Sequence, residues 1–305
     1  MINQQEDPLV SIALCTYNGD FFLSELLDSL VAQSYKNLEI IVVDDASSDQ
    51  TVQIIMSYAS KYNFVKLYQN DANLGFVKNF EKTIRLCNGE FIALADQDDI
   101  WKLDKISLMV DKIDNHCLLY HDSELISEEG KLINQKISDI VRFYDGDAAE
   151  AFLFFNCVSS HALMFKKELT QYLFPFCTNG IHDSWIAYVA VNIGSISYIN
   201  DCLVLYRQHQ CSSTDILKRK KKRETNRLEI FNAKLEWLNC CKDFAYNKNP
   251  LLIKEIFVLF KLRKTNIFSF KLFFLLISNY KNIFPIYKKS FLSKLNFIIK
   301  NAVSV

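Results

Sequence analysis

The first hundred residues repeat one pattern, in which a short run of strand-forming apolar residues ends in polar side chains and a helical pattern follows. Four such runs occur, at residues 10–16, 39–43, 65–68 and 90–95. Near-continuous apolar strands separated by helices predict an α/β fold, with a mostly parallel sheet covered by helices on both faces. No other feature of the chain constrains its fold as much.

Apolar residues at helical spacing predict the segments that separate and follow these strands. The expected helices are residues 21–33, 51–59, 76–86 and 102–110. From about residue 115 the signals are mixed, with expected strands at 117–121, 162–165 and 197–206 and a helix at 185–191. No linker interrupts this part, so we expect one continuous domain over residues 1–215 and a helical region over residues 216–305.

Polar groups follow three of the expected strands, at the point where each strand ends. They are Thr16-Tyr17-Asn18, Asp44-Asp45 and Asp96-Gln97-Asp98-Asp99. In open α/β sheets, ligands bind at the carboxyl ends of the strands, so the topology gathers these side chains along one edge. We therefore expect the functional site there.

The acidic segment at residues 96–99 follows a buried strand directly, so its carboxylates repel one another and lose hydration. A divalent cation relieves both problems, and carboxylate oxygens suit Mg²⁺ or Mn²⁺. Mg²⁺ is often held by one or two carboxylates together with substrate phosphates, which points to a phosphate-bearing substrate. The alternative is an acidic loop that caps the next helix.

Other phosphate-binding motifs are missing from the sequence. There is no G-x-x-x-x-G-K-[ST] segment, which argues against a P-loop kinase, and no G-x-G-x-x-G follows the first strand, which argues against an ordinary dinucleotide-binding fold. A metal bridge is then the natural way to neutralise a diphosphate.

Six motifs occur in a characteristic order. They are VSIALCTYNG (10–19), IIVVDDASSDQT (40–51), NLGFVKNF (73–80), GEFIALADQDDIW (89–101), HDSW (182–185) and YRQH (206–209). Together they resemble the family 2 glycosyltransferases, which have the Rossmann-like GT-A fold and invert the anomeric centre of the sugar. The DQDDIW form, with HDSW and YRQH, is most similar to the rhamnosyltransferase branch. The resemblance covers residues 8–212; within it, Cys15 stands where the family often has proline.

The resemblance implies a site for a nucleotide-sugar donor. The implied donor-binding residues are Thr16, Tyr17, Asn18, Asp44, Asp45, Lys78, Asp96, Asp99, Trp101, Arg207 and His209. Asp44 or Asp45 would accept hydrogen bonds from base and ribose, while the other carboxylate caps a helix.

The same resemblance assigns the metal to Asp98, with Asp96 serving the metal or the donor sugar. Asp99 contacts the sugar or caps the helix. Trp101 stacks on the sugar or anchors the core. The implied cofactor is Mg²⁺ or Mn²⁺.

Inversion needs a base that takes the proton of the acceptor hydroxyl. By resemblance this base is Asp183, and burial beside the sugar would raise its pKa towards neutrality. His182 is the rival because its ordinary pKa is already near neutral, and Asp183 as a helix cap is the structural alternative. Arg207 and His209 lie on one side of an extended segment and are expected to bind the diphosphate. His161 either faces the acceptor or packs in the core.

The nine cysteines show no C-x-x-C spacing, which favours buried, reduced thiols. The N-terminus has neither a basic start nor an apolar segment typical of export signals. The longest uncharged apolar stretch near the end, residues 272–280, is too short to cross a bilayer. We therefore expect a cytoplasmic protein, with any membrane contact peripheral and on the inner face.

Charge is unevenly distributed although the formal net charge is zero. Residues 1–100 carry 15 acidic and 6 basic side chains, whereas residues 251–305 carry 10 basic side chains and one acid, Glu255. Aromatic residues and lysines alternate over residues 268–300, as in a helix lying on a membrane, or as in helices packed on the domain with lysines outward. The basic run at 218–223 has no neighbouring aromatic residues for base stacking, so we expect no nucleic-acid binding.

The resemblance, together with these observations, implies an inverting, metal-dependent glycosyltransferase. It would move a sugar to a saccharide or lipid-linked acceptor in cell-surface polysaccharide synthesis, with rhamnose from dTDP-rhamnose as the first candidate donor. UDP-galactose, UDP-glucose and N-acetylhexosamine donors remain open. A non-catalytic scaffold subunit with the same fold is the alternative from another class.

Overall fold

The structure is a computed structural model, and it describes residues 7–177, 182–210, 212, 226–264 and 267–304. The basic run at 218–223 and the expected boundary between residues 215 and 216 lie outside these ranges. In the described part, nine strands form one sheet in the order β3-β2-β1-β4-β8-β6-β9-β5, with β7 paired to β6. The strands are β1 (Val10–Thr16), β2 (Leu38–Asp44), β3 (Val65–Gln69), β4 (Phe91–Ala95), β5 (Ile100–Trp101), β6 (Leu118–Ile126), β7 (Leu132–Lys136), β8 (Leu163–Lys166) and β9 (Ile196–Arg207).

The sheet has a parallel half and a mixed half. Strands β3, β2, β1 and β4 run parallel, and β6 is parallel to β9. Strand β8 is antiparallel to both of its neighbours, β4 and β6, and β5 is antiparallel to β9. The predicted α/β class and the four N-terminal strands are therefore confirmed.

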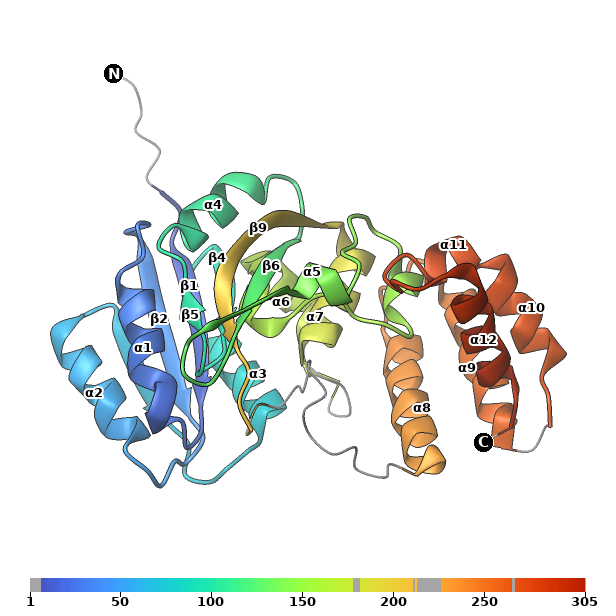
Figure 1. Cartoon of the computed structure of the whole chain (residues 1–305), viewed down its shortest axis with the longest axis horizontal. Helices are drawn as coiled ribbons and strands as arrows, with labels where there is room; N and C mark the ends of the chain where they lie inside the picture. Colours follow the sequence, from blue (N-terminus) through green and yellow to red (C-terminus); the bar gives the residue numbers. More distant parts are fainter. Residues whose placement is uncertain (1–6, 178–181, 211, 213–225, 265–266, 305) are drawn as a thin grey trace, which may run out of the picture.

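Helices cover both faces of this sheet (Figure 1). The α-helices are α1 (Asp20–Val31), α2 (Thr51–Lys61), α3 (Phe76–Leu86), α4 (Lys105–Lys112), α5 (Ile137–Ile140), α6 (Thr170–Leu173), α7 (His182–Ile193), α8 (Arg227–Asp243), α9 (Pro250–Lys261), α10 (Phe270–Ser278), α11 (Tyr280–Ile283) and α12 (Phe291–Ala302). Short 3₁₀ helices occur at Ala149–Phe152, Ser160–Ala162, Lys167–Leu169 and Leu262–Lys264.

Alternate residues of the central strands point into two separate cores, as the period of a strand requires. Ile40 and Val42 of β2 pack with α1, α2 and α4, whereas Ile41 lies in the core formed with α3 and α7. Both faces of the parallel half are thus sealed, and its carboxyl edge is left to carry polar side chains.

The helices after residue 226 extend the second of these cores. Ile256, Phe260, Leu272 and Ile298 are all buried in the cluster that contains α3 and α7. The C-terminal helices were expected either to lie on a membrane or to pack on the domain. These four side chains pack on the domain. None of the helices in the described ranges combines the length and the hydropathy that a bilayer-crossing segment needs.

The expectation that all the cysteines are reduced is wrong for one pair. Cys177 and Cys240 form a disulfide, with their Cα atoms 6.0 Å apart. The two residues are 63 positions apart, and folding brings α8 against the segment that precedes α7, so local sequence spacing gave no sign of the pair. Cys15, Cys87 and Cys202 are free thiols.

Candidate active site

The ends of β1 and β2 are tied together by the first of the acidic pair. Thr16 Oγ1 donates to Asp44 Oδ1 at 2.9 Å, and the Ser47 hydroxyl donates to the same oxygen at 2.6 Å. The Ser47 backbone N–H donates to Asp44 Oδ2 at 2.8 Å. Asp44 is fully buried, so its carboxylate fixes the edge of the sheet at the place expected for a nucleoside.

Asp45 has a different set of partners. Its carboxylate accepts from the side chain of Asn70 at 2.7 Å and from the backbone N–H groups of Leu74 and Gly75 at 2.8 and 2.9 Å. Gly75 has φ of 80°, a left-handed conformation that glycine adopts without strain, and α3 begins after it. Asp45 therefore shapes the Asn73–Gly75 turn that precedes α3.

The loop after β1 is held against the loop after β4. The Tyr17 backbone N–H donates to Gln97 Oε1 at 2.9 Å, and Gln97 Nε2 donates back to the Tyr17 carbonyl at 3.2 Å. The Tyr17 side chain is 47 % exposed, so it is available to a ligand. Asn18 has φ of 45° and accepts from the Ser48 N–H at 2.9 Å. Three strand ends thus meet at one edge, as the sequence indicates.

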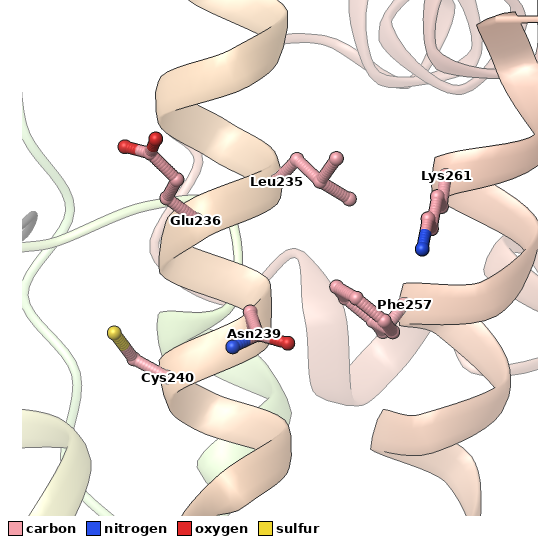
Figure 2. Close-up of a pocket in the computed structure, with 6 residues that line it drawn as sticks. All are labelled: Leu235, Glu236, Asn239, Cys240, Phe257 and Lys261. Atoms are coloured by element: carbon pink, nitrogen blue, oxygen red, sulfur yellow. The ribbon is translucent and has the colours of Figure 1, made fainter.

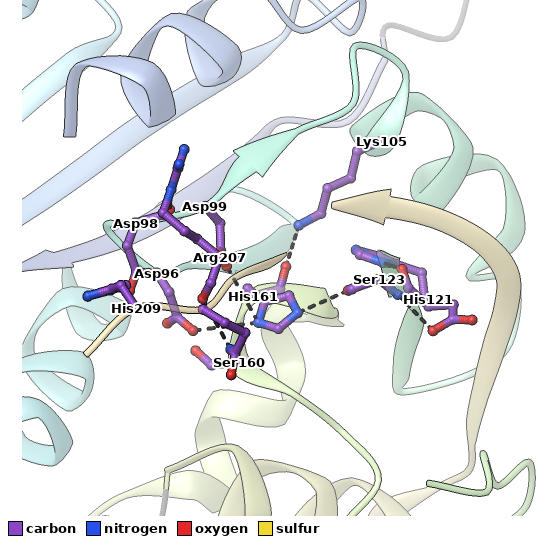
Figure 3. Close-up of polar contacts among 12 residues, drawn as sticks. Asp96, Asp98, Asp99, Lys105, His121, Ser123, Ser160, His161, Arg207 and His209 are labelled. Carbon is purple, nitrogen blue, oxygen red and sulfur yellow. Dashed lines mark hydrogen bonds and ion pairs between the residues drawn. The ribbon is translucent and has the colours of Figure 1, made fainter. Parts of the chain in front are cut away.

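The three carboxylates of the acidic loop at 96–99 have two histidine neighbours: Asp98 lies against His209, whereas Asp96 and Asp99 lie near His161 (Figure 3). Asp98 Oδ2 lies 2.8 Å from His209 Nε2, which comes from the segment after β9. Asp99 is fully buried and accepts from the Arg207 N–H at 2.9 Å, and its Oδ2 has no hydrogen-bond partner. Burial, with the charges of Asp98 and Asp96, raises the pKa of Asp99 well above its ordinary value.

His161 lies between the acidic loop and the interior. Its Nδ1 is 3.7 Å from Asp96 Oδ2 and 3.6 Å from Asp99 Oδ2, and its Nε2 is 3.0 Å from the Ser123 hydroxyl. The ring is buried and lies 4.2 Å, centroid to centroid, from the ring of Tyr206. His161 thus packs in the core, and it does so against two of the predicted site acids.

The residues present fit a divalent cation. Ligand atoms of Asp96, Asp99 and His161 all lie within 4.8 Å of one another, and the unpartnered Asp99 Oδ2 is among the buried polar atoms there. Asp98 and His209 form a second pair of candidate ligands beside them. Carboxylate oxygens suit Mg²⁺ and Mn²⁺, and metal-ligating imidazoles are common in proteins.

Arg207 is placed differently from the expectation that it binds the diphosphate. Its side chain is buried, and the guanidinium donates to the carbonyls of Asp98 and Glu128 at 2.9 and 2.7 Å. It also forms a 2.7 Å ion pair with Glu25 of α1. With its donors directed to protein acceptors, Arg207 holds the acidic loop in place.

Trp101 and Lys78 are also placed away from the expected sugar site. Trp101 lies on β5, and its side chain is buried in the core that contains α1 and α4. The Lys105 ammonium lies 3.2 Å from the centroid of its ring. The core alternative therefore holds for Trp101. Lys78 is exposed on α3, where it lines a surface hollow with Lys82 and Phe176 rather than the acidic loop.

Asp183 is the second residue of α7. Asn156 Nδ2 donates to its Oδ1 at 3.1 Å, and the Ser184 hydroxyl donates to the same atom at 3.2 Å. Burial raises the pKa of Asp183 to about 7, and the charge of Asp96 adds to the effect. Asp183 is therefore close enough to the acidic loop to respond to its charge.

His182 is enclosed by the protein. Its ring stacks on Phe80 with centroids 4.1 Å apart, its Nε2 is 2.9 Å from the Ser160 hydroxyl, and its side chain is buried. Burial lowers the pKa of His182 to about 4, so the imidazole is neutral near pH 7. It is a weak base, which favours Asp183 of the two.

A second surface hollow, of about 270 Å³, lies between α8 and α9 and is separate from the acidic loop (Figure 2). Its lining is Leu235, Glu236, Asn239, Cys240, Phe257 and Lys261. None of these residues was predicted to bind a ligand.

Several residues that shape the site escaped the sequence analysis. Asn156 comes from an irregular segment before β8, and Glu25 looks like a solvent-facing helix residue, so neither gives a local signal. Gln97 was named as part of the acidic segment but was given no role; its side chain holds the loop after β1 against the loop after β4.

Comparison with known proteins gives one family and a consistent fold. Residues 11–173 match the family described as Glycosyl transferase family 2. An uncharacterized glycosyltransferase of Haemophilus influenzae is 29 % identical over 222 residues, and one of Rickettsia typhi is 28 % identical over 217 residues. These matches cover 66 % and 68 % of this chain, respectively, and 66 % of each relative.

Solved structures show the same fold at lower sequence identity. Staphylococcus aureus TarS in complex with UDP-GlcNAc is 19 % identical, with a TM-score of 0.59 over 96 % of this chain and 81 % of that one. A mannosyltransferase of Pyrobaculum calidifontis in complex with GDP-Man and Mn²⁺ is 18 % identical, with a TM-score of 0.53 over 81 % of this chain and 67 % of that one. At these identities the likeness concerns the fold.

Proposed function

Because this chain belongs to Glycosyl transferase family 2, we propose that it transfers a sugar from a nucleotide diphosphate donor to a saccharide or lipid-linked acceptor, with inversion at the anomeric carbon. The observation that carries the proposal is the meeting of three strand ends at one edge. There Thr16 and Asp44 lie on one side, and Asp98 with His209 on the other.

Asp183 is the proposed catalytic base. Its carboxylate takes the proton of the acceptor hydroxyl as that oxygen attacks the anomeric carbon. The bond from this carbon to the diphosphate oxygen breaks, and nucleoside diphosphate leaves. A pKa of about 7 makes Asp183 a better base than an ordinary aspartate while leaving it ionised above neutrality. Asn156 fixes the carboxylate by its 3.1 Å hydrogen bond.

The donor nucleoside is proposed to bind across the ends of β1 and β2, against Tyr17 and Asn18, beside the buried Asp44. Asp98 and His209 would hold a divalent ion, Mg²⁺ or Mn²⁺. Asp96, whose carboxylate lies in the neighbouring group with Asp99 and His161, would be a further ligand. A bound divalent ion would neutralise negative charge on the donor diphosphate. Arg207 keeps this loop in position from behind by binding the Asp98 carbonyl.

The identity of the donor sugar is a finer proposal. Rhamnose from dTDP-rhamnose is the first candidate on motif resemblance, and a UDP-hexose or a UDP-N-acetylhexosamine is the alternative donor. The proposed setting is synthesis of a cell-surface polysaccharide such as O-antigen or capsule.

A scaffold subunit without turnover is the second candidate. A scaffold without turnover is expected to have lost the metal-binding acidic residues or the catalytic base. Asp96, Asp98 and Asp183 are all present in this chain, and the pKa of Asp183 is raised. The presence of these acidic residues therefore favours an enzyme.

The test is release of nucleoside diphosphate from a panel of nucleotide sugars, with Mn²⁺ and a panel of saccharide and lipid-linked acceptors. We expect one donor to be consumed in an acceptor-dependent reaction by the wild type and not by the D183N variant. Turnover of that donor by D183N at the wild-type rate would overturn the assignment of the base. Absence of turnover and of donor binding in folded protein would favour the scaffold.

A further inference from the structure

The outer side of the C-terminal helices carries large apolar side chains that nothing in the described chain covers. On α10, Phe270 is 69 % exposed, Phe274 is 63 % exposed and Ile277 is 37 % exposed. Their spacing of four and then three residues places them on one face of the helix. The opposite face carries Leu272 and Leu276, which are fully buried.

This face continues onto the end of α12. Phe268 forms an antiparallel bridge with Val303, and its ring lies 4.7 Å from that of Phe270. Val303 is 38 % exposed. We call Phe270, Phe274, Ile277 and Val303 the apolar face; it lies at the end of the molecule opposite α2 (Figure 1).

Charge around the apolar face is of one sign. Residues 251–305 contain ten basic side chains and a single acid, Glu255, which is paired with Lys271 at 3.1 Å. Three lysines near the face in the chain are exposed: Lys264 precedes it, Lys281 follows α10, and Lys300 lies on α12 three residues before Val303. An exposed apolar stripe bordered by lysines is the pattern of a helix that lies in the headgroup region of a bilayer.

We propose that the apolar face docks the protein on a bilayer that contains anionic lipids. Phe270 and Phe274 enter the boundary between headgroups and acyl chains, and the surrounding lysines remain among the anionic headgroups. The nine residues of α10 extend about 14 Å, which suits a helix lying in the plane of the interface and not one crossing it. A second copy of the chain fits less well, because a symmetric contact would bring the two sets of lysines together.

This inference goes beyond the proposed sugar transfer, and its test does not use activity. Full-length protein is mixed with vesicles of phosphatidylglycerol and phosphatidylethanolamine, or of phosphatidylcholine alone, and the bound fraction is measured by flotation. We expect binding to the anionic vesicles that weakens as salt is raised, and little binding to phosphatidylcholine. Equal binding to both vesicle types, or to neither, would overturn the proposal.

The double variant F270S/F274S should lower the partition coefficient on anionic vesicles by about tenfold or more, because it removes two aromatic rings from the interface. Met56→Ser is the matched control, since Met56 is 58 % exposed on α2, at the other end of the molecule. Both changes lie at exposed positions, so circular dichroism should show folded protein. Unchanged binding by folded F270S/F274S would contradict the proposal. The proposal would also be contradicted if light scattering showed that the wild type is a dimer, and that F270S/F274S disrupts this dimer without reducing vesicle binding.

Discussion

The His209 imidazole Nε2 lies 2.8 Å from the Asp98 carboxylate Oδ2, although the two residues are 111 positions apart in the chain. Arg207, two residues before His209, binds the backbone carbonyl of Asp98 at 2.9 Å. The end of β9 and the residues after it therefore close over the acidic loop: Arg207 supports the loop from behind, and His209 contributes a polar group to the site.

His209 should bind the metal together with Asp98. We expect His209→Ala and Asp98→Ala each to weaken Mn²⁺ binding by about tenfold or more, because each substitution removes one proposed ligand. Titration of Mn²⁺ by electron paramagnetic resonance, with nucleoside diphosphate present, measures this affinity. If H209A binds Mn²⁺ as the wild type does, His209 serves the phosphate alone.

The rate of transfer should depend on the ionisation of Asp183. Burial raises its pKa to about 7, so the base is protonated and inactive below that pH and ionised above it. We expect kcat/KM to fall about tenfold per pH unit below pH 7 and to reach a plateau above it. The D183N variant should retain donor binding and show only a low, pH-independent rate. A wild-type profile that is flat between pH 5 and 8 would exclude Asp183 as the titrating base.

Arg207 should matter for stability as well as for the site. Arg207→Ala removes the donor to two carbonyls and to Glu25, and it leaves buried acceptors without partners. We expect the free energy of unfolding to fall by about 3 kcal/mol.

Glu25→Gln is the control for Arg207, because Glu25 is 54 % exposed and the glutamine still offers the buried guanidinium an oxygen acceptor, so we expect the smaller loss of stability. Urea denaturation of both variants gives the comparison. Equal losses in the two variants would show that the ion pair, and not the carbonyl contacts, accounts for the role of Arg207.

The Cys177–Cys240 disulfide should stabilise the packing of α8 on the domain. It closes a loop of 63 residues, so the chain-entropy estimate of its contribution is about 4 kcal/mol. We expect the C177S/C240S variant to unfold at lower denaturant concentration than oxidised wild type. A reductant should bring the wild type to the level of the variant.

Cys202→Ser serves as the control, because Cys202 is a free, half-buried thiol. Its stability should change little and should respond to reductant as the wild type does. If the oxidised and reduced forms of the wild type are equally stable, the disulfide contributes nothing.

Local pattern predicted the elements of the first hundred residues well. The helix over residues 76–86 has the predicted bounds, and the strand expected at 39–43 is Leu38–Asp44. These elements are determined by apolar periodicity and by nearby turn residues, both of which are present in the sequence. The convergence of polar side chains at the strand ends followed from topology in the same way.

The remaining features depend on contacts between distant segments. The parallel pairing of β6 with β9, the burial of Arg207 beneath the acidic loop and the contact between Asn156 and Asp183 are all set by tertiary packing. Trp101 illustrates the limit, because a tryptophan after an acidic motif suits a sugar pocket and a core equally, and only its neighbours decide.

Binding of the donor tests the central claim most directly. Isothermal titration calorimetry should compare dTDP-rhamnose, UDP-glucose, UDP-galactose, UDP-GlcNAc and GDP-mannose, with and without Mn²⁺, on the wild type and on Asp98→Ala. We predict that one donor binds in a Mn²⁺-dependent manner and that this binding is lost in D98A. Failure of every donor to bind folded wild-type protein, or Mn²⁺-dependent binding that survives in D98A, would contradict the account.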